Sequence, residues 1–145
     1  MVDVFPRETR SRVMSMIRSR WTKQERMLHG FLKGWRIRHT MHPALPGQPD
    51  IFVPPRTLVF VDGCFWHGCP RCYNTPKSNI RYWKRKVESN RARDRKVNAA
   101  LRRRGWLVIR VWECELKKAP SKFLGRIMRA LQRRRTGATA RHPLA

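Results

Sequence analysis

Four cysteines constrain the fold of this chain more than any other feature of its sequence. Cys64, Cys69 and Cys72 lie within nine residues, and Cys114 follows much later. The CPRC spacing lets the sulfurs of Cys69 and Cys72 reach one tetrahedral ion, and Cys64 and Cys114 can supply its other two corners. Such a structural zinc would join the loop after a central strand to the end of a later strand. Four buried free thiols are the alternative, but they explain neither the clustering nor the CPRC motif.

The compartment follows from what the N-terminal sequence lacks. MVDVFPRETR has no apolar segment followed by small residues, as a secretory signal would. The longest apolar run near the middle of the chain, residues 58–61, is far shorter than the roughly 20 residues that cross a bilayer. We therefore expect a cytoplasmic protein with reduced cysteines and no membrane partner.

Basic side chains dominate the composition. The chain has 34 Lys and Arg against 9 Asp and Glu, a formal net charge of +25. This excess favours nucleic acid as the partner, ahead of an anionic membrane surface or an acidic protein. The hydrophobic content of 41% is that of a folded domain, and 145 residues leave room for only one. We expect one small folded domain that binds nucleic acid.

Hydrophobic spacing predicts four helical regions. Thr22 and Glu25 form a capping box that starts a helix over 22–33. Apolar residues at 3/4 spacing over 78–104 predict one long basic helix, or two, closed by Gly105. The remaining regions are a short basic helix over 8–18 and a last helix that starts at Ser121.

Four segments are predicted to be strands. Residues 35–40 alternate apolar with basic side chains, and residues 51–53 and 57–61 are β-branched runs separated by two prolines. Residues 106–112 are typical of a buried strand. The predicted order is therefore a helix, a β-rich centre, a helix, a strand and a helix.

Two carboxylates lie at predicted strand ends. Asp50 opens the strand 51–53, and Asp62 ends the strand 57–61, so adjacent strands would bring the two together. Paired carboxylates in a field of positive charge make an oxygen site for Mg²⁺, as a nuclease requires. The alternative is that both residues cap turns and pair with surface arginines.

His67 follows Asp62 by five residues, in the sequence DGCFWHGC. A bend there can turn its imidazole over the carboxylates, where it could act as the general base that takes a proton from a water attacking phosphorus. A zinc ligand and a packed histidine are the alternatives.

Large aromatic side chains are interleaved with basic ones. Phe65 and Trp66 lie in the cysteine loop and Trp83 lies on the long basic helix. Such rings can wedge between bases and kink a duplex, although tryptophan at helical spacing is commonly core. Met14, beside Arg10 and Arg12, has the same two interpretations.

Several strings, in this order and spacing, resemble the very short patch repair (Vsr) DNA mismatch endonucleases. They cover residues 8–116 and comprise TRSRVMSMIRSRWTKQE, LPGQPDI, VFVDGCFWHGCPRCY, RYWKRKVESNRARD and GWLVIRVWECEL. The resemblance implies an α/β fold of the restriction-endonuclease-like PD-(D/E)XK superfamily, with a central mixed sheet flanked by helices and a structural zinc. It also implies a Mg²⁺-dependent enzyme that nicks DNA 5′ of the thymine in a T:G mismatch left by deamination of 5-methylcytosine.

The resemblance assigns roles to the residues that match. Asp50 and the Val61 carbonyl would bind Mg²⁺, His67 would be the base, and Glu25 would support the metal-bound water. Asp62 stands where some members carry His and would be an additional metal ligand, and Cys69 replaces a zinc ligand that can be His. The DNA-binding residues implied are Met14 from the minor groove, the basic Arg10 and Arg12, and an intercalating platform of Phe65, Trp66 and Trp83.

The same resemblance divides the chain into an endonuclease domain, residues 1–118 with a DNA-contacting helix at 8–18, and a C-terminal basic helix and tail, residues 119–145. It implies a monomer in the bacterial cytoplasm, associated with the nucleoid and bound to double-stranded DNA with a T:G mismatch. Mismatch-repair proteins and a cytosine-5 DNA methyltransferase pathway are candidate partners. The alternatives are a nickase with another DNA target, in phage defence or transposition, and a non-catalytic RNA-binding zinc module.

Overall fold

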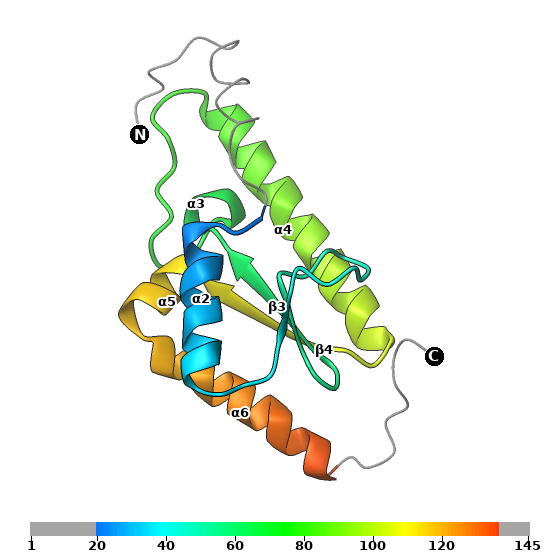
Figure 1. The fold of residues 1–145 in the computed structure, drawn as a ribbon. Helices are drawn as coiled ribbons and strands as arrows, with labels where there is room; N and C mark the ends of the chain where they lie inside the picture. Colours follow the sequence, from blue (N-terminus) through cyan, green and yellow to red (C-terminus); the bar gives the residue numbers. More distant parts are fainter. Residues whose placement is uncertain (1–19, 137–145) are drawn as a thin grey trace.

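A four-stranded mixed sheet forms the centre of the molecule in the computed structural model, which describes residues 20–136 (Figure 1). The strands lie in chain order across the sheet: β1 (Thr40–Met41), β2 (Ile51–Val53), β3 (Thr57–Asp62) and β4 (Leu107–Trp112). β2 pairs antiparallel with both β1 and β3, whereas β4 runs parallel to β3 with Val59 opposite Ile109. The predicted strands at 51–53, 57–61 and 106–112 are confirmed to within one residue.

The first described helix, α2 (Lys23–Gly34), starts at the predicted capping box. The Thr22 hydroxyl accepts a hydrogen bond from the Glu25 N–H at 3.3 Å. The Glu25 carboxylate accepts from the Trp21 N–H at 2.7 Å, one residue earlier than a capping box usually reaches. Local sequence therefore sets this helix start, and it also fixes the Glu25 carboxylate.

The strand predicted over 35–40 is wrong except for Thr40. Arg36 adopts a left-handed backbone conformation (φ 58°). Its N–H donates to the Lys33 carbonyl, and the Ile37 N–H donates to the Leu32 carbonyl, which is the Schellman arrangement that ends a helix. Trp35 and Ile37 are apolar because they pack on the core, so their alternation imitated a strand.

Residues 78–104 form one helix, α4 (Ile80–Arg103), and the predicted alternative of two is wrong. Gly105 follows it with φ 92°, as a residue just past a helix end requires, and the Trp106 N–H donates to the Leu101 carbonyl at 3.1 Å. α6 (Pro120–Thr136) begins one residue before the predicted Ser121. Two short helices were not predicted: α3 (Cys64–His67) and α5 (Glu113–Lys118).

The helices cover both faces of the sheet and make three layers (Figure 1). On one face, α2, α5 and α6 pack on the sheet through fully or almost fully buried side chains, among them Leu28, Leu116, Phe123 and Ile127. On the other face, Leu101 of α4 packs with Trp106 and Phe60. Within residues 20–136, no helix has the length and apolar character to span a membrane. The carboxyl ends of β3 and β4 thus lie between α2, α3 and α4.

Candidate functional site

The Asp50 carboxylate is fixed at the end of β3. Asp50 immediately precedes β2, where its N–H donates to the Val59 carbonyl at 3.0 Å and its carboxylate accepts the Val61 N–H at 2.7 Å. Burial raises the pKa of Asp50 to about 6, the Val61 N–H opposes this rise, and the charges of Glu25 and Asp62 add to it. The carboxylate lines a hollow of about 420 Å³. A half-buried acid of raised pKa in a hollow is typical of a functional group.

Glu25 and His42 lie beside Asp50. Glu25 is almost completely buried, and its carboxylate lies 2.5 Å from Nε2 of His42. The imidazole lowers the pKa of Asp50, whereas the carboxylate of Glu25 raises it. Glu25 therefore lies close enough to Asp50 to affect its pKa, and His42 is a third member of this group that sequence reasoning missed.

The raised pKa of Asp50 predicts how stability depends on pH in Mg²⁺-free buffer. A folded-state pKa of about 6 against an ordinary 3.8 means that ionisation favours unfolding, so stability falls as pH rises from about 4 to above 6. The two pKa values correspond to roughly 3 kcal/mol. Urea unfolding across this range measures it. Asp50→Asn keeps an acceptor for the Val61 N–H and is expected to lose this part of the pH dependence, and identical curves for both proteins would contradict the prediction.

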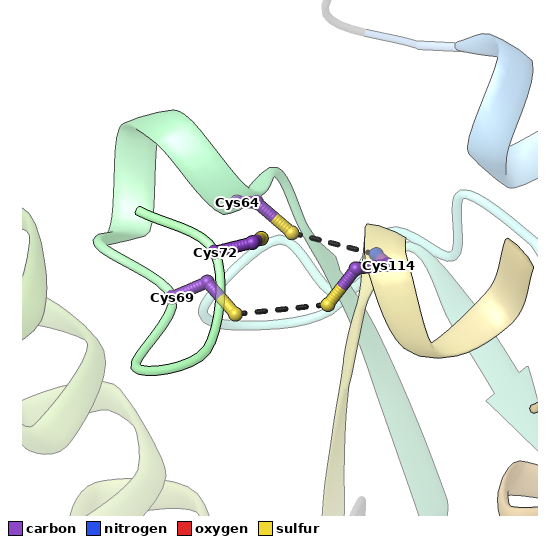
Figure 2. Close-up of side chains that lie close together, drawn as sticks. All are labelled: Cys64, Cys69, Cys72 and Cys114. Carbon is purple, nitrogen blue, oxygen red and sulfur yellow. Dashed lines mark hydrogen bonds between the residues drawn. The ribbon is translucent and has the colours of Figure 1, made fainter. Parts of the chain in front are cut away.

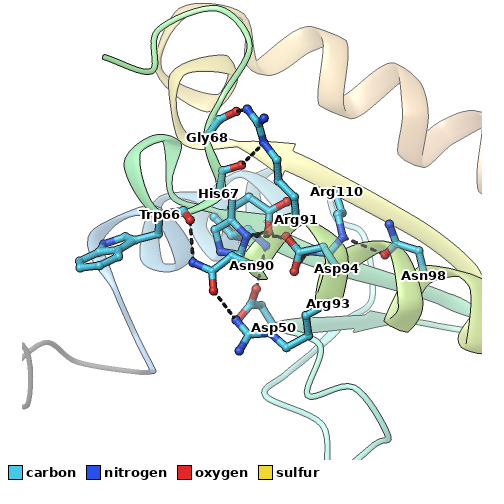
Figure 3. Close-up of polar contacts among 12 residues, drawn as sticks. Asp50, Trp66, His67, Gly68, Asn90, Arg91, Arg93, Asp94, Asn98 and Arg110 are labelled. Atoms are coloured by element: carbon cyan, nitrogen blue, oxygen red, sulfur yellow. Dashed lines mark hydrogen bonds and ion pairs between the residues drawn. The ribbon is translucent and has the colours of Figure 1, made fainter. Parts of the chain in front are cut away.

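A second polar cluster joins α3, α4 and β4 (Figure 3). Nδ1 of His67 lies 2.6 Å from an Asp94 carboxylate oxygen and 3.8 Å from Oδ1 of Asp62. The Arg110 guanidinium donates to Asp62 at 2.8 Å and lies 3.6 Å from Asp94. Burial raises the pKa of Asp62, against the lowering effect of Arg110 and His67. An ionised Asp94 only accepts hydrogen bonds, so His67 donates from Nδ1 and its Nε2 is left as an acceptor.

The ligand atoms of Asp62, His67 and Asp94 lie within 4.8 Å of one another, close enough to hold a metal ion. The Arg110 guanidinium already provides a positive charge to both carboxylates. A second cation at the same point would meet this charge at short range. The spacing of the cluster is thus compatible with metal binding, the charge of Arg110 opposes a cation there, and the contacts of Asp94 and Asp62 orient His67.

Side chains of α4 hold the α3 loop in place (Figure 3). Asn90 donates to the Trp66 carbonyl at 2.8 Å, and Arg91 donates to the carbonyls of His67 and Gly68. Gly68 has φ 64°, and a Cβ there would lie 2.5 Å from a methyl carbon of Val87. The glycine thus allows the close approach of α4 that positions His67.

The four cysteines converge, as their spacing predicts (Figure 2). Their sulfurs all lie within 4.8 Å of one another, and those of Cys69 and Cys114 are 3.7 Å apart. Zn–S bonds of about 2.3 Å in a tetrahedron place sulfurs about 3.8 Å apart, so the spacing fits a zinc ion. Burial raises the pKa of Cys64. It also acts to raise that of Cys69, but backbone N–H groups and neighbouring thiols lower the latter to about 7. The cluster joins α3 and its loop to α5, and it is compatible with metal binding.

The predicted aromatic residues form one cluster. The ring centroid of Phe65 lies 5.2 Å from that of Trp66 and 5.1 Å from that of Trp83. Trp83 is buried, whereas Phe65 and Trp66 are half-buried and the Trp66 ring points away from the polar residues (Figure 3). Tyr82, 52% exposed and stacked edge-on against Trp83, extends the cluster. The accessible rings are therefore Phe65, Trp66 and Tyr82, with Trp83 as their support.

Comparison with known proteins gives this site a family. Residues 2–74 match the family described as DNA mismatch endonuclease Vsr. The DNA mismatch endonuclease Vsr of Escherichia coli is 38% identical over 121 residues, which are 81% of this chain and 77% of that protein. The chain belongs to the Vsr family. It is a DNA nicking endonuclease, a hydrolase, as the sequence predicts. The alternative of a non-catalytic RNA-binding zinc module is therefore wrong.

Other Vsr-family relatives carry a different name. The type II nicking enzyme V.XorIIP of Xanthomonas oryzae pv. oryzae is 46% identical over 120 residues, 80% of this chain and 88% of that protein. The type II nicking enzyme V.NmeAIP of Neisseria meningitidis is 42% identical over 122 residues, 81% of this chain and 86% of that protein. DNA is therefore the substrate, and its preferred sequence or mismatch is a separate question.

Several residues that the resemblance to the Vsr family singled out lie outside the described part of the chain, and several residues of the site were not predicted. The helix over 8–18, with Met14, Arg10 and Arg12, lies outside the described residues, as does the tail beyond residue 136. His42, Asp94 and Arg110 were missed. Asp94 alone had a usable signal, because an acid within a strongly basic helix is expected to have a specific partner.

Proposed function

We propose that this Vsr-family protein is a Mg²⁺-dependent endonuclease of the restriction-endonuclease-like fold that nicks duplex DNA 5′ of the thymine in a T:G mismatch. The observation that carries the proposal is the Asp50 carboxylate, held by the Val61 N–H beside Glu25 and His42. Asp50 and the Val61 carbonyl would hold Mg²⁺, with Glu25 and Asp62 nearby. When bound, Mg²⁺ would stabilise the negative charge that develops on the scissile phosphate.

His67 is assigned as the general base. Its Nδ1 is engaged by Asp94, so Nε2 can take the proton from the attacking water. Arg110 and Asp62 hold Asp94 and the imidazole in this arrangement. In this proposal the proton acceptor, His67, lies on α3, and the metal-binding carboxylate, Asp50, lies just before β2.

The aromatic cluster is assigned to mismatch recognition. Phe65 and Trp66 directly precede His67. A ring inserted between two nucleobases would therefore also bring the scissile phosphate close to His67, the general base. A mispaired step unstacks at lower cost than a matched one, and this difference gives the selectivity. The exposed lysines and arginines of α4 would contact phosphates, so affinity is expected to fall steeply with salt.

A labelled duplex with one T:G mismatch, beside its matched T:A twin, tests the proposal in Mg²⁺ and in EDTA. A Mg²⁺-dependent nick 5′ of the mismatched thymine, absent in Asp50→Ala, is expected. Equal cutting of both duplexes would retain the nickase and reject mismatch repair. That outcome would favour the second candidate, a nickase with another DNA target, which the names of the type II nicking relatives support.

Replacing Asp94 with asparagine tests how His67 is oriented. The amide can present its N–H₂ to Nδ1 and stabilise the wrong tautomer, so kcat is expected to fall roughly 10- to 100-fold with little change in KM. Single-turnover nicking of the mismatched duplex measures the effect. Asn98→Ala is the matched control, because Asn98 bonds the same Arg110 without touching His67. An unchanged kcat in Asp94→Asn would reject the orienting role.

A further inference from the structure

A groove lined by arginines lies at the opposite end of the sheet from Asp50. It has a volume of about 680 Å³ and is lined by the start of β4 and the residues just before it, by the β2–β3 turn and by parts of α4 and α6. β3 and β4 are parallel, so their amino ends lie together and their carboxyl ends lie together. The length of the strands therefore separates the groove from the residues at the carboxyl ends. Five arginines line it: Arg56, Arg102, Arg126, Arg129 and Arg133.

Three of the five arginines in this arginine groove have no acidic partner in the described part of the chain. No acidic residue lines it. Among residues 20–133, no carboxylate lies within ion-pair distance of Arg56, Arg102 or Arg129. Arg126 differs, because Glu115 accepts two bonds of 3.0 Å from it and the Arg110 carbonyl accepts a third at 2.7 Å. Cations gathered around a concave surface favour an anionic occupant.

The groove also contains the open edge of the sheet. β4 is an edge strand, and in the described part of the chain only β3 pairs with it. The Leu107 N–H donates to the Arg56 carbonyl, on the β3 side. Alternation along a strand then directs the backbone groups of Val108 and Arg110 outward, and Arg126 bonds the Arg110 carbonyl there. The Val108 N–H and C=O are left as the edge on which another strand can form.

We propose that the arginine groove docks an extended acidic segment of a partner protein as an additional strand on β4. The backbone of the segment would bond the outward N–H and C=O of Val108. Its acidic side chains would reach Arg56, Arg102 and Arg129, and its alternate apolar side chains would cover the half-buried Leu107 and Ala130. The nicking site proposed above includes none of these residues, so the groove is a separate surface.

Two other occupants fit the groove less well. Duplex phosphates would meet the arginines, but they cannot pair with a strand edge and gain nothing from the apolar lining residues. A second copy of the chain could pair edge to edge with β4. Its own five groove arginines would then face the five arginines of the first copy, and their like charges would repel. The combination of cations, apolar side chains and a free strand edge favours an acidic peptide.

A fluorescent, end-blocked hexapeptide of alternating glutamate and valine is the probe, titrated against the full chain at about 0.15 M salt. Loss of one charge-assisted contact predicts that Arg129→Glu weakens binding about tenfold. Arg38→Glu, an equal charge change at an exposed residue before β1 on the opposite edge, is expected to bind as the unchanged protein does. A peptide N-methylated at alternate residues keeps its charge but not its edge hydrogen bonds, and it is expected to bind at least about tenfold more weakly.

Each other outcome would overturn the proposal. Equal binding of the two peptides would mean attraction by charge alone. Equal weakening by Arg38→Glu and Arg129→Glu would mean that no particular groove is used. Absence of peptide binding, with Arg129→Glu weakening binding of a matched duplex, would assign the groove to DNA. A dimer in sedimentation that Arg129→Glu alters would assign it to a second copy.

Discussion

Replacing Asp50 with asparagine is expected to slow Mg²⁺-dependent nicking by about 10³-fold or more. Asparagine has nearly the same shape and still offers an oxygen to the Val61 N–H, so the backbone around β2 and β3 is retained. What is lost is the negative charge that a hard cation requires. Single-turnover nicking of the T:G duplex measures the chemical step, and a separate titration in EDTA measures DNA binding.

Binding and folding separate the interpretations of an inactive Asp50→Asn. DNA affinity without Mg²⁺ is expected to be unchanged or higher, because one negative charge has been removed from a site that faces phosphate. Glu88→Gln is the matched control, since Glu88 is an exposed acid on α4, and its nicking rate is expected to remain within about twofold. Nicking by Asp50→Asn at a comparable rate would exclude Asp50 as the metal ligand.

Elements whose signals are local were predictable from the sequence. The start of α2 depends on Thr22 and Glu25, three residues apart, and the end of α4 depends on Gly105. β2 and β3 are short β-branched runs whose separating turn is marked by two prolines. The strand predicted over residues 35–40 was wrong for a local reason too. Arg36 takes the left-handed conformation that sequence rules assign to glycine at a helix end.

The candidate site was predictable only in part, because its pairs are distant in the chain. Asp50 could be placed beside Val61, since a short hairpin joins them. Asp62 lies close enough to Asp50 for its charge to raise the Asp50 pKa, as adjacent strands predict, whereas its ion pair with Arg110, 48 residues away, was not predictable. Asp94 reaches His67 across 27 residues. A pattern of spacing has no information about which helix packs over which strand end.

The cysteine cluster is the exception to this rule about distance. Cys114 is 50 residues from Cys64, but its N–H lies 3.4 Å from the Cys64 sulfur. Four cysteines have few ways to be used in a small reduced protein, so residue type replaced spacing as the signal. The packing of α3 against the start of α5 follows from this one constraint, and it fixes the loop that carries Phe65, Trp66 and His67.

Replacing Cys72 with serine is the sharpest test of zinc in this cluster. Cys72 is exposed whereas Cys64 is buried, so a cluster of free thiols predicts a neutral Cys72→Ser and a costly Cys64→Ser. A tetrahedral zinc needs both sulfurs equally. With zinc, Cys72→Ser is expected to cost several kcal/mol and lower Tm by about 10–20 °C, as much as Cys64→Ser.

Thermal unfolding, together with zinc content per chain by atomic emission, measures this effect. Asn74→Ser, an exposed change in the same loop, is the control and is expected to shift stability by less than about 0.5 kcal/mol. One zinc per chain in the unchanged protein, lost in both cysteine variants, is the expected result. A stable, zinc-free Cys72→Ser with full nicking activity would reject the structural zinc. The α3 loop would then depend on its other contacts with α4, among them the bonds that Asn90 and Arg91 donate to its carbonyls and the contact of His67 with Asp94.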